Sequence, residues 1–271
     1  MIPETERSMS LDSIASDFKR KINNGVSTYD LLRVAAHFRR LELENNLYSN
    51  LNGVIVDGPF KGMSYLPSAH ASTLTPKLLG IYEKEIQSDL LAIAKSVDSF
   101  LDVGCAEGYY TTGLALLQNI KSVVGIDIKD ESLMAASHLA AVNHVNHKTY
   151  FTSTIESALK RLVGRTLMMI DVDGSEIEVI KEIFRFTPKE LLVSTSFIVE
   201  TDYHEDGRSN KSEILTEFHS KDFELTKEIE QDPSCRISET SRSYTQSFLD
   251  LAILGMEGRP MNQSWLILNH R

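Results

Sequence analysis

The chain has very few cysteines: among its 271 residues only Cys105 and Cys235 occur, far apart and in no metal-ligand spacing. A disulfide framework is therefore not expected, and so little cysteine favours a reducing cytoplasm. No apolar run approaches the length of a membrane span, and no apolar core follows a basic N-terminal stretch. We therefore expect a cytoplasmic protein that carries no signal peptide and does not enter a membrane.

Positive charge is also scarce. The chain has 28 Lys and Arg residues against 38 Asp and Glu, a net charge of −10, and a pI near 5.3. This balance disfavours broad binding to a nucleic-acid backbone, which needs a basic surface. The length of 271 residues and the apolar fraction of 42% suit one large domain with added segments, or one domain with a small helical part. We expect an N-terminal helical or cap region over 1–96 and the principal domain over 97–271.

One apolar run that ends in a glycine turn organises the rest of the chain. Phe100, Leu101 and Val103 suit a parallel strand that is covered on both faces. Gly104 and Gly108 let the backbone turn sharply and approach a ligand closely. A helix that begins near Gly108 would aim free N–H groups at that ligand.

An acidic residue follows this turn at the spacing typical of nucleotide-binding sites. Asp127 ends a second apolar run, 19 residues beyond Gly108, where a carboxylate can accept hydrogen bonds from a ribose diol. The turn reads G-x-x-x-G rather than the G-x-G-x-x-G of dinucleotide sites, and it contains Glu107 with Asp102 just before it. These anions would repel a pyrophosphate and favour a cationic head such as that of S-adenosylmethionine (SAM). Glycines that serve packing alone are the simpler alternative.

Three segments resemble one family of enzymes. Asp102–Tyr110 (DVGCAEGYY) resembles motif I of class I SAM-dependent methyltransferases, and Val124–Asp127 (VGID) resembles their motif II. Ile170–Ile180 (IDVDGSEIEVI) resembles the IDVEGAE-x-EVL signature of FkbM-type methyltransferases, from which it departs with Asp173 for Glu and Ser175 for Ala. A shorter acid at position 173 shifts its reach by about one C–C bond.

The resemblance covers roughly 97–200 and implies the family's doubly wound, seven-stranded, Rossmann-like α/β sheet, here with an N-terminal helical extension. It implies SAM as the cofactor. We take Cys105, within the turn, as a small packing residue rather than a nucleophile. The residues expected to bind the cofactor are Asp102, Gly104, Cys105, Glu107, Gly108, Tyr109, Asp127, Ile128, Ser153 and Thr154.

Alternating strands and helices predict a parallel sheet with right-handed crossovers. Strands are expected at 98–103, 122–127, 149–151, 166–171 and 191–200, with helices at 108–118 and 130–143 and from Thr154 and Gly174. A strand at 223–230, a mobile surface loop at 231–243 and a helix at 245–256 precede a last strand at 264–268. In the class I methyltransferase fold, that last strand lies antiparallel between strands 5 and 6.

The N-terminal third reads as helices around an irregular loop. Helices are expected at 11–22, from a cap at Thr28, and over 75–96. Between them, a short strand at 54–56 and a glycine-rich loop would offer Lys61, Tyr65 and His70 to an active site, or would serve only as a connector.

Acids after the fourth strand are the first candidates for chemistry. Asp171 and Asp173 are two residues apart at a strand end, so they can share a face. Either could bind the acceptor, act as general base, or ligate Mg²⁺ with Glu200 or Asp202. A metal is not favoured, because Asp173 also suits a helix start whose dipole attracts acids.

His204 is a second candidate base, since its ordinary pKa suits neutral pH. A solvated loop histidine is the alternative. The predicted catalytic residues are therefore Asp171, Asp173 and His204, with no metal ligand assigned.

Together these patterns predict a SAM-dependent methyltransferase that O-methylates a small molecule, such as a sugar or natural-product hydroxyl. A nucleotide-dependent oxidoreductase and a non-catalytic SAM-binding module are the alternatives. A nucleic-acid acceptor is disfavoured by the charge, although an RNA methyltransferase stays open in principle. The N-terminal helices could cover the substrate or form a homodimer.

Overall fold

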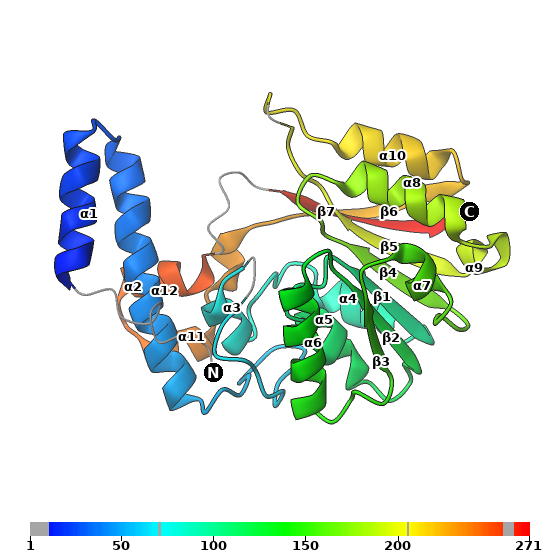
Figure 1. The fold of residues 1–271 in the computed structure, drawn as a ribbon, viewed down its shortest axis with the longest axis horizontal. Helices are drawn as coiled ribbons and strands as arrows, with labels where there is room; N and C mark the ends of the chain where they lie inside the picture. Colours follow the sequence, from blue (N-terminus) through cyan, green and yellow to red (C-terminus); the bar gives the residue numbers. More distant parts are fainter. Residues whose placement is uncertain (1–10, 70–71, 205, 257–262) are drawn as a thin grey trace.

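The computed structural model describes residues 11–69, 72–204, 206–256 and 263–271, and a seven-stranded sheet lies at its centre (Figure 1). The strand order is β3-β2-β1-β4-β5-β7-β6. Only β7 runs against the others, pairing antiparallel with β5 and β6. This confirms the predicted sheet and its reversed last strand. The strands are β1 (Ser99–Val103), β2 (Ser122–Ile126), β3 (Thr149–Thr152), β4 (Thr166–Ile170), β5 (Thr195–Glu200), β6 (Phe223–Glu230) and β7 (Ser264–His270).

Helices cover both faces of the sheet (Figure 1). In Figure 1, α4, α5 and α6 lie on one face, and α7, α8 and α10 lie on the other. The helices are α1 (Leu11–Asn23), α2 (Thr28–Asn50), α3 (Leu74–Leu78), α4 (Gln87–Ala94), α5 (Tyr109–Ala115), α6 (Asp130–Val142), α7 (Ile155–Leu159), α8 (Glu176–Phe186), α9 (Lys189–Val193), α10 (Lys211–His219), the 3₁₀ helix η2 (Pro233–Arg236), α11 (Glu239–Tyr244) and α12 (Phe248–Gly255).

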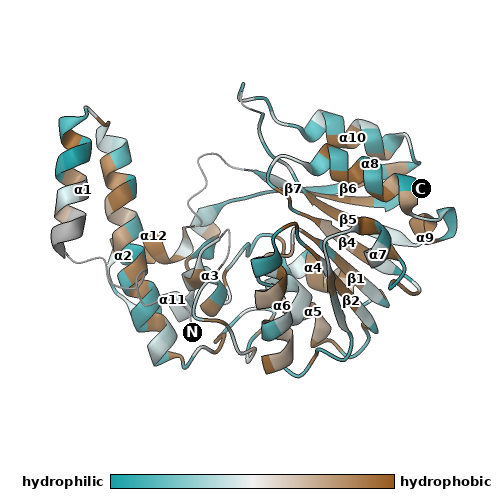
Figure 2. Cartoon of the chain, viewed as in Figure 1, coloured by the Kyte–Doolittle hydropathy of each residue, from teal (hydrophilic) through white to brown (hydrophobic). Residues whose placement is uncertain are grey.

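Two apolar cores follow from the alternation of side chains along the strands. Phe100 of β1 packs into one core with α4, α5 and α6, while its neighbour Leu101 packs into the other with α7, α8 and α10. Figure 2 shows the strands largely in brown and much of the outward surface of α8 and α10 in teal. The first core also contains residues from before β1, such as Ile55 and Leu78. The central strands are therefore buried on both faces, as the runs of apolar residues predicted.

The first two helices form a hairpin that stands to the left of the sheet in Figure 1. Ser27 caps α2 by accepting a hydrogen bond from the Asp30 backbone N–H, so the cap lies one residue before the predicted Thr28. Leu47 is the buried residue of α2, which packs against α3 and α12. Among the described helices, none combines the length and the apolarity that a bilayer crossing requires.

The predicted helix over 75–96 is wrong, because the chain breaks it into α3 and α4. Gly80 adopts a left-handed φ of +69°, and a Cβ there would lie 1.9 Å from the Asp57 carbonyl oxygen. Glu83 also has a positive φ, of 44°. A close backbone contact therefore overrides the helical spacing of the apolar residues.

Three other local predictions need correction. Residues 191–193 end helix α9 rather than open β5, because Pro188 precedes α9 and fixes its start. The segment at 231–243 is folded into η2 and α11 rather than a surface loop, and Arg236 within it is buried against Glu85. The expected strand at 54–56 is reduced to a single bridge between Val54 and Ser64. His70 lies outside the described residues.

Candidate active site

The glycine turn joins the ends of three neighbouring strands. The backbone N–H groups of Gly104 and Cys105 both donate to the Ile126 carbonyl at the end of β2, at 2.9 Å each. Gly104 has φ +91°, and a Cβ there would lie 1.7 Å from the carbonyl oxygen of Asp171, which follows β4. Gly108 then begins α5 as its N-cap. The turn is therefore held rigidly over the carboxyl ends of β1, β2 and β4.

Asp127 lies at the end of β2 and fixes the far side of this turn. One of its carboxylate oxygens accepts the Ala106 N–H at 3.0 Å, and the other accepts the Lys129 N–H at 2.8 Å. A carboxylate has about four lone-pair sites, so each oxygen keeps capacity for a further donor. Asp127 is only half-buried, so these sites face the space beyond the strands.

A cavity of about 700 Å³ lies beyond the carboxyl ends of the strands. Such crevices are where open α/β sheets bind their ligands, and this volume is within the range of cofactor and small-molecule pockets. The predicted residues that line it are Asp102, Gly104, Cys105, Tyr109, Asp127, Ile128, Ser153, Asp171 and Asp173. The predicted residues Glu107, Gly108, Thr154 and His204 are not part of its lining.

Acidic groups dominate the charge of the cavity. Among the described residues, its lining contains six carboxylates and two lysines: Asp102, Asp127, Glu131, Asp171, Asp173 and Glu182 against Lys77 and Lys129. A polyanion such as a phosphate backbone would meet repulsion here, whereas a neutral or cationic molecule would not.

Asp102, the last acid of β1, is buried at the cavity wall. The Thr111 hydroxyl donates to its carboxylate at 2.6 Å. Burial raises its pKa to about 7, because desolvation outweighs the Thr111 hydrogen bond and the negative charge of Asp171 adds to the rise. Near neutral pH, Asp102 is therefore poised to ionise when a positive group approaches.

Glu107 is paired inside the protein. It is fully buried, and its Oε1 accepts hydrogen bonds from the Tyr65 hydroxyl and from Lys77 Nζ, both at 2.5 Å. Burial opposes its ionisation, but the charge and hydrogen bond of Lys77 and the bond from Tyr65 outweigh it, so its pKa lies below the ordinary value. Glu107 therefore ties residues before β1 to the turn, which the sequence assigned to the cofactor instead.

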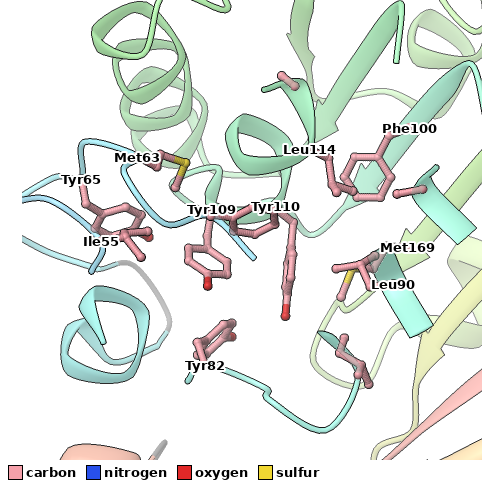
Figure 3. Packing of buried hydrophobic residues seen from close by; sticks show 14 of the residues in the cluster. Ile55, Met63, Tyr65, Tyr82, Leu90, Phe100, Tyr109, Tyr110, Leu114 and Met169 are labelled. Atoms are coloured by element: carbon pink, nitrogen blue, oxygen red, sulfur yellow. The ribbon is translucent and has the colours of Figure 1, made fainter. Parts of the chain in front are cut away.

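Tyrosine rings from two segments meet beside the cavity. Figure 3 shows Tyr109 and Tyr110 of α5 pointing toward Tyr82, which lies between α3 and α4. The ring centroids of Tyr82 and Tyr109 are 5.3 Å apart with nearly perpendicular planes, and all three tyrosines line the cavity. The sequence did not single out Lys77 or Tyr82, because both fell within an apparently regular amphipathic helix and no pattern distinguished them.

Three carboxylates come together next to this wall. One oxygen from each of Glu83, Asp171 and Glu200 lies within 4.8 Å of the other two. The Tyr110 hydroxyl donates to Glu83 at 2.5 Å, and the Gln231 amide donates to Glu200 at 2.6 Å. Oxygen ligands of this kind could hold Mg²⁺. Asp202, which the sequence also considered, instead accepts hydrogen bonds from the Tyr203 backbone N–H and the Gln263 amide.

Asp173 and His204 take different places. Asp173 lines the cavity with φ +48°, just before α8, where the Gly174 N–H donates to the buried Glu176 carboxylate at 2.9 Å. Burial raises the pKa of Glu176. His204 Nε2 lies 3.0 Å from Glu213 Oε1 on a partly exposed loop. The structure thus brings Asp171 and Asp173 to the cavity and leaves His204 outside it.

Comparison with known proteins agrees with this geometry. Residues 94–162, which hold the glycine turn, Asp127 and Ser153, match a family model described as a methyltransferase domain. No curated protein sequence matches the chain.

Solved structures show a distant likeness. The ribosomal protein L11 methylase of Lactobacillus delbrueckii subsp. bulgaricus is 17% identical, with a TM-score of 0.43 over 69% of this chain and 79% of that one. The magnesium protoporphyrin IX methyltransferase of Synechocystis PCC 6803, solved with bound S-adenosylhomocysteine (SAH), is 13% identical, with a TM-score of 0.44 over 70% of this chain and 83% of that one.

The fold, the rigid glycine turn, the acid at the end of β2 and the matched domain define the class. The chain is a methyltransferase that uses SAM as its methyl donor.

Proposed function

We propose that this chain methylates a hydroxyl group of a small acceptor that carries no negative charge, such as a sugar or a natural product. The acidic lining of the cavity is the observation that supports this proposal. It favours neutral and cationic acceptors and disfavours phosphorylated molecules and nucleic acid. The FkbM-type signature that Ile170–Ile180 resembles is in keeping with such an acceptor.

The residues on the cavity wall fit SAM by their chemistry. The Asp127 carboxylate retains acceptor sites for the two ribose hydroxyls. The buried Asp102 carboxylate offers a counter-charge for an amino group. When bound, SAM supplies a methyl group already activated by its sulfonium, so the protein contributes mainly by alignment.

Asp171 is the residue that we assign to the acceptor. It lines the cavity at the end of β4, is half-buried, and lies against Gly104 of the turn. Glu83 and Glu200 each place a carboxylate oxygen within 4.8 Å of one of its own. Asp171 would accept the hydroxyl proton as the acceptor oxygen bonds to the methyl carbon. Asp173 would orient the acceptor from the same edge.

Methyl transfer from tritium-labelled SAM to an acceptor panel tests this proposal. The panel contains neutral sugars, amino sugars, sugar phosphates, transfer RNA and a protein mixture. Label on a neutral or amino sugar, absent with Asp127→Ala, is the expected result. Preferential labelling of the phosphates or of RNA would overturn the assignment of acceptor class.

Calorimetric titration with SAH and NADH separates the wider alternatives. Binding of NADH but not SAH would indicate an oxidoreductase. SAH binding without transfer to any acceptor across a broad panel would favour a non-catalytic SAM-binding module.

A further inference from the structure

Lys77 is a buried cation whose hydrogen-bonding capacity exceeds the partners that surround it. Its side chain is 3% exposed, and its Nζ has one hydrogen-bond acceptor within the described part of the chain, Glu107 Oε1 at 2.5 Å. An ammonium group carries three N–H donors. The faces of the Tyr82 and Tyr109 rings, centred 4.8 and 5.5 Å away, attract its charge but offer no oxygen lone pair from the ring face. The remaining donors suit an oxygen ligand.

The position of Lys77 places those donors in the cavity. Lys77 lines it together with the glycine turn and Asp102. The other lysine of the described lining, Lys129, follows Asp127 and donates its backbone N–H to that acid, so it belongs to the ribose end. The charge of Lys77 acts on Asp102, where it favours the ionised carboxylate. Lys77 is therefore the cation at the Asp102 end of the cavity.

The methionine part of SAM needs such a pair of opposite charges. Its ammonium and its carboxylate are attached to one carbon, so an anion and a cation of the protein must lie near each other to bind both. Asp102 and Lys77 meet this requirement. With SAM as the cofactor of the proposed function, we propose that Lys77 binds the methionine carboxylate while Asp102 binds the amino group.

Glu107 is the counter-charge of Lys77 in the protein without ligand. It gives Lys77 a permanent counter-charge, so the folded protein does not bury an uncompensated ammonium before the ligand arrives. The Tyr65 hydroxyl donates to the same oxygen of Glu107 and holds the carboxylate in place. Lys77 lies in α3, outside the segment that matches the methyltransferase domain, so the carboxylate site is an addition from the N-terminal region.

The test compares two probes that differ only in the carboxylate. SAH and its decarboxylated analogue, S-adenosyl-3-thiopropylamine, are titrated by calorimetry into the full chain. Because either single substitution would leave the other charge buried without its counter-charge, the comparison is made between wild type and the double variant Lys77→Met/Glu107→Gln. The ratio of the two dissociation constants is the readout, since general damage to the site weakens both probes alike.

We expect wild type to bind SAH about tenfold or more tightly than the analogue, the range of a charge-assisted hydrogen bond. The double variant should bind both within about twofold. An unchanged preference in the double variant would overturn the role of Lys77 but leave the cofactor intact. If wild type bound neither probe, the proposed function would fail as well.

A second double variant controls for damage to packing around the pair. Lys77→Gln/Glu107→Gln keeps a hydrogen bond between the two side chains while removing both charges. It should lose most of the same preference, and a full preference there would also overturn the proposal.

Discussion

Gly104 and Asp171 are in direct backbone contact: a Cβ on Gly104 would lie 1.7 Å from the carbonyl oxygen of Asp171. The Asp171 N–H also donates to the carbonyl of Val103, one residue before the glycine, at 2.9 Å. Gly104 belongs to the cofactor turn, and Asp171 is the acid we assign to the acceptor. The two halves of the reaction are therefore held by one rigid backbone unit.

Gly104→Ala should break this unit. The substitution combines a left-handed φ of +91° with an overlap against backbone that cannot move aside. We expect a loss of about 3 kcal/mol or more in the free energy of unfolding. SAH binding should fall with it, measured by urea unfolding and calorimetry.

Gly62→Ala is the matched control for that variant. Gly62 has nearly the same φ, +90°, but nothing lies within 4 Å of a Cβ there. It should lose only the conformational part, about 1–2 kcal/mol. Equal losses in the two variants would show that the contact with Asp171 contributes nothing.

The buried pair of Lys77 and Glu107 should dominate the stability of the turn. Removing one partner strands the other charge inside the protein, so Lys77→Met should lower the free energy of unfolding by about 3–5 kcal/mol. The double variant Lys77→Met/Glu107→Gln should recover much of that loss, because no uncompensated charge remains. Urea unfolding of the two single variants and the double variant measures the coupling, and simple additivity would contradict it.

Asp127→Ala should weaken SAH binding by about 1.5–3 kcal/mol, through the loss of charge-assisted bonds to the ribose. The two backbone N–H groups that Asp127 accepts would also lose their partner, so the turn should loosen. Asp130→Ala removes the same charge from an exposed position three residues away and serves as the control. Calorimetry should find the control within about 0.5 kcal/mol of wild type.

Asp171→Asn should slow methyl transfer to an acceptor found in the panel by about 10²–10⁴-fold, the range of a lost general base. At pH 8, above the titration of Asp102, SAH affinity should change little, so the effect should fall on kcat. His204→Gln should transfer at a rate close to that of wild type, since His204 contacts Glu213 rather than the cavity. A large loss of kcat in His204→Gln alone would move the base to that loop.

The central strands could be predicted from the sequence because β1, β2, β4 and β5 are buried on both faces. Such strands appear as short apolar runs, and the glycine turn and Asp127 fix the spacing of the first βαβ unit. The segment around Gly80 could not be predicted in this way. Its break depends on close packing against Asp57, a contact between residues 23 positions apart that no local pattern encodes.

The residues of the cofactor turn could likewise be predicted from the sequence, but the partners of the charged residues could not. Glu107 lies within the segment that resembles motif I. Whether it faces the ligand or a buried partner depends on Lys77, which reaches it from α3. Glu200 lies beside Asp171 because β4 pairs with β5, and Glu83 reaches the same cluster from the segment between α3 and α4. Contacts between distant segments therefore decide which acids surround Asp171 and which are paired away from the cavity.

Asp102 should make cofactor binding depend on pH near neutrality. Burial raises its pKa from 3.8 to about 7, so the folded state favours the protonated form. Its contribution to stability is complete below about pH 4 and is lost as the pH rises toward 7. The ammonium of SAH favours the ionised form instead, so SAH affinity should rise between pH 6 and pH 7.5.

Because folding favours protonated Asp102 and SAH favours the ionised form, Asp102 should release a proton when SAH binds. Calorimetry in two buffers of different ionisation enthalpy at pH 6.5 should show a fraction of a proton leaving the protein when SAH binds. Asp102→Asn cannot ionise and should show no such release and a flat affinity between pH 6 and pH 7.5. The negative charge of Asp171 raises the pKa of Asp102, so Asp171→Asn should lower the midpoint of the pH profile of SAH affinity. An unshifted midpoint in Asp171→Asn would mean that the two carboxylates titrate independently, and that the acceptor acid does not tune the cofactor site.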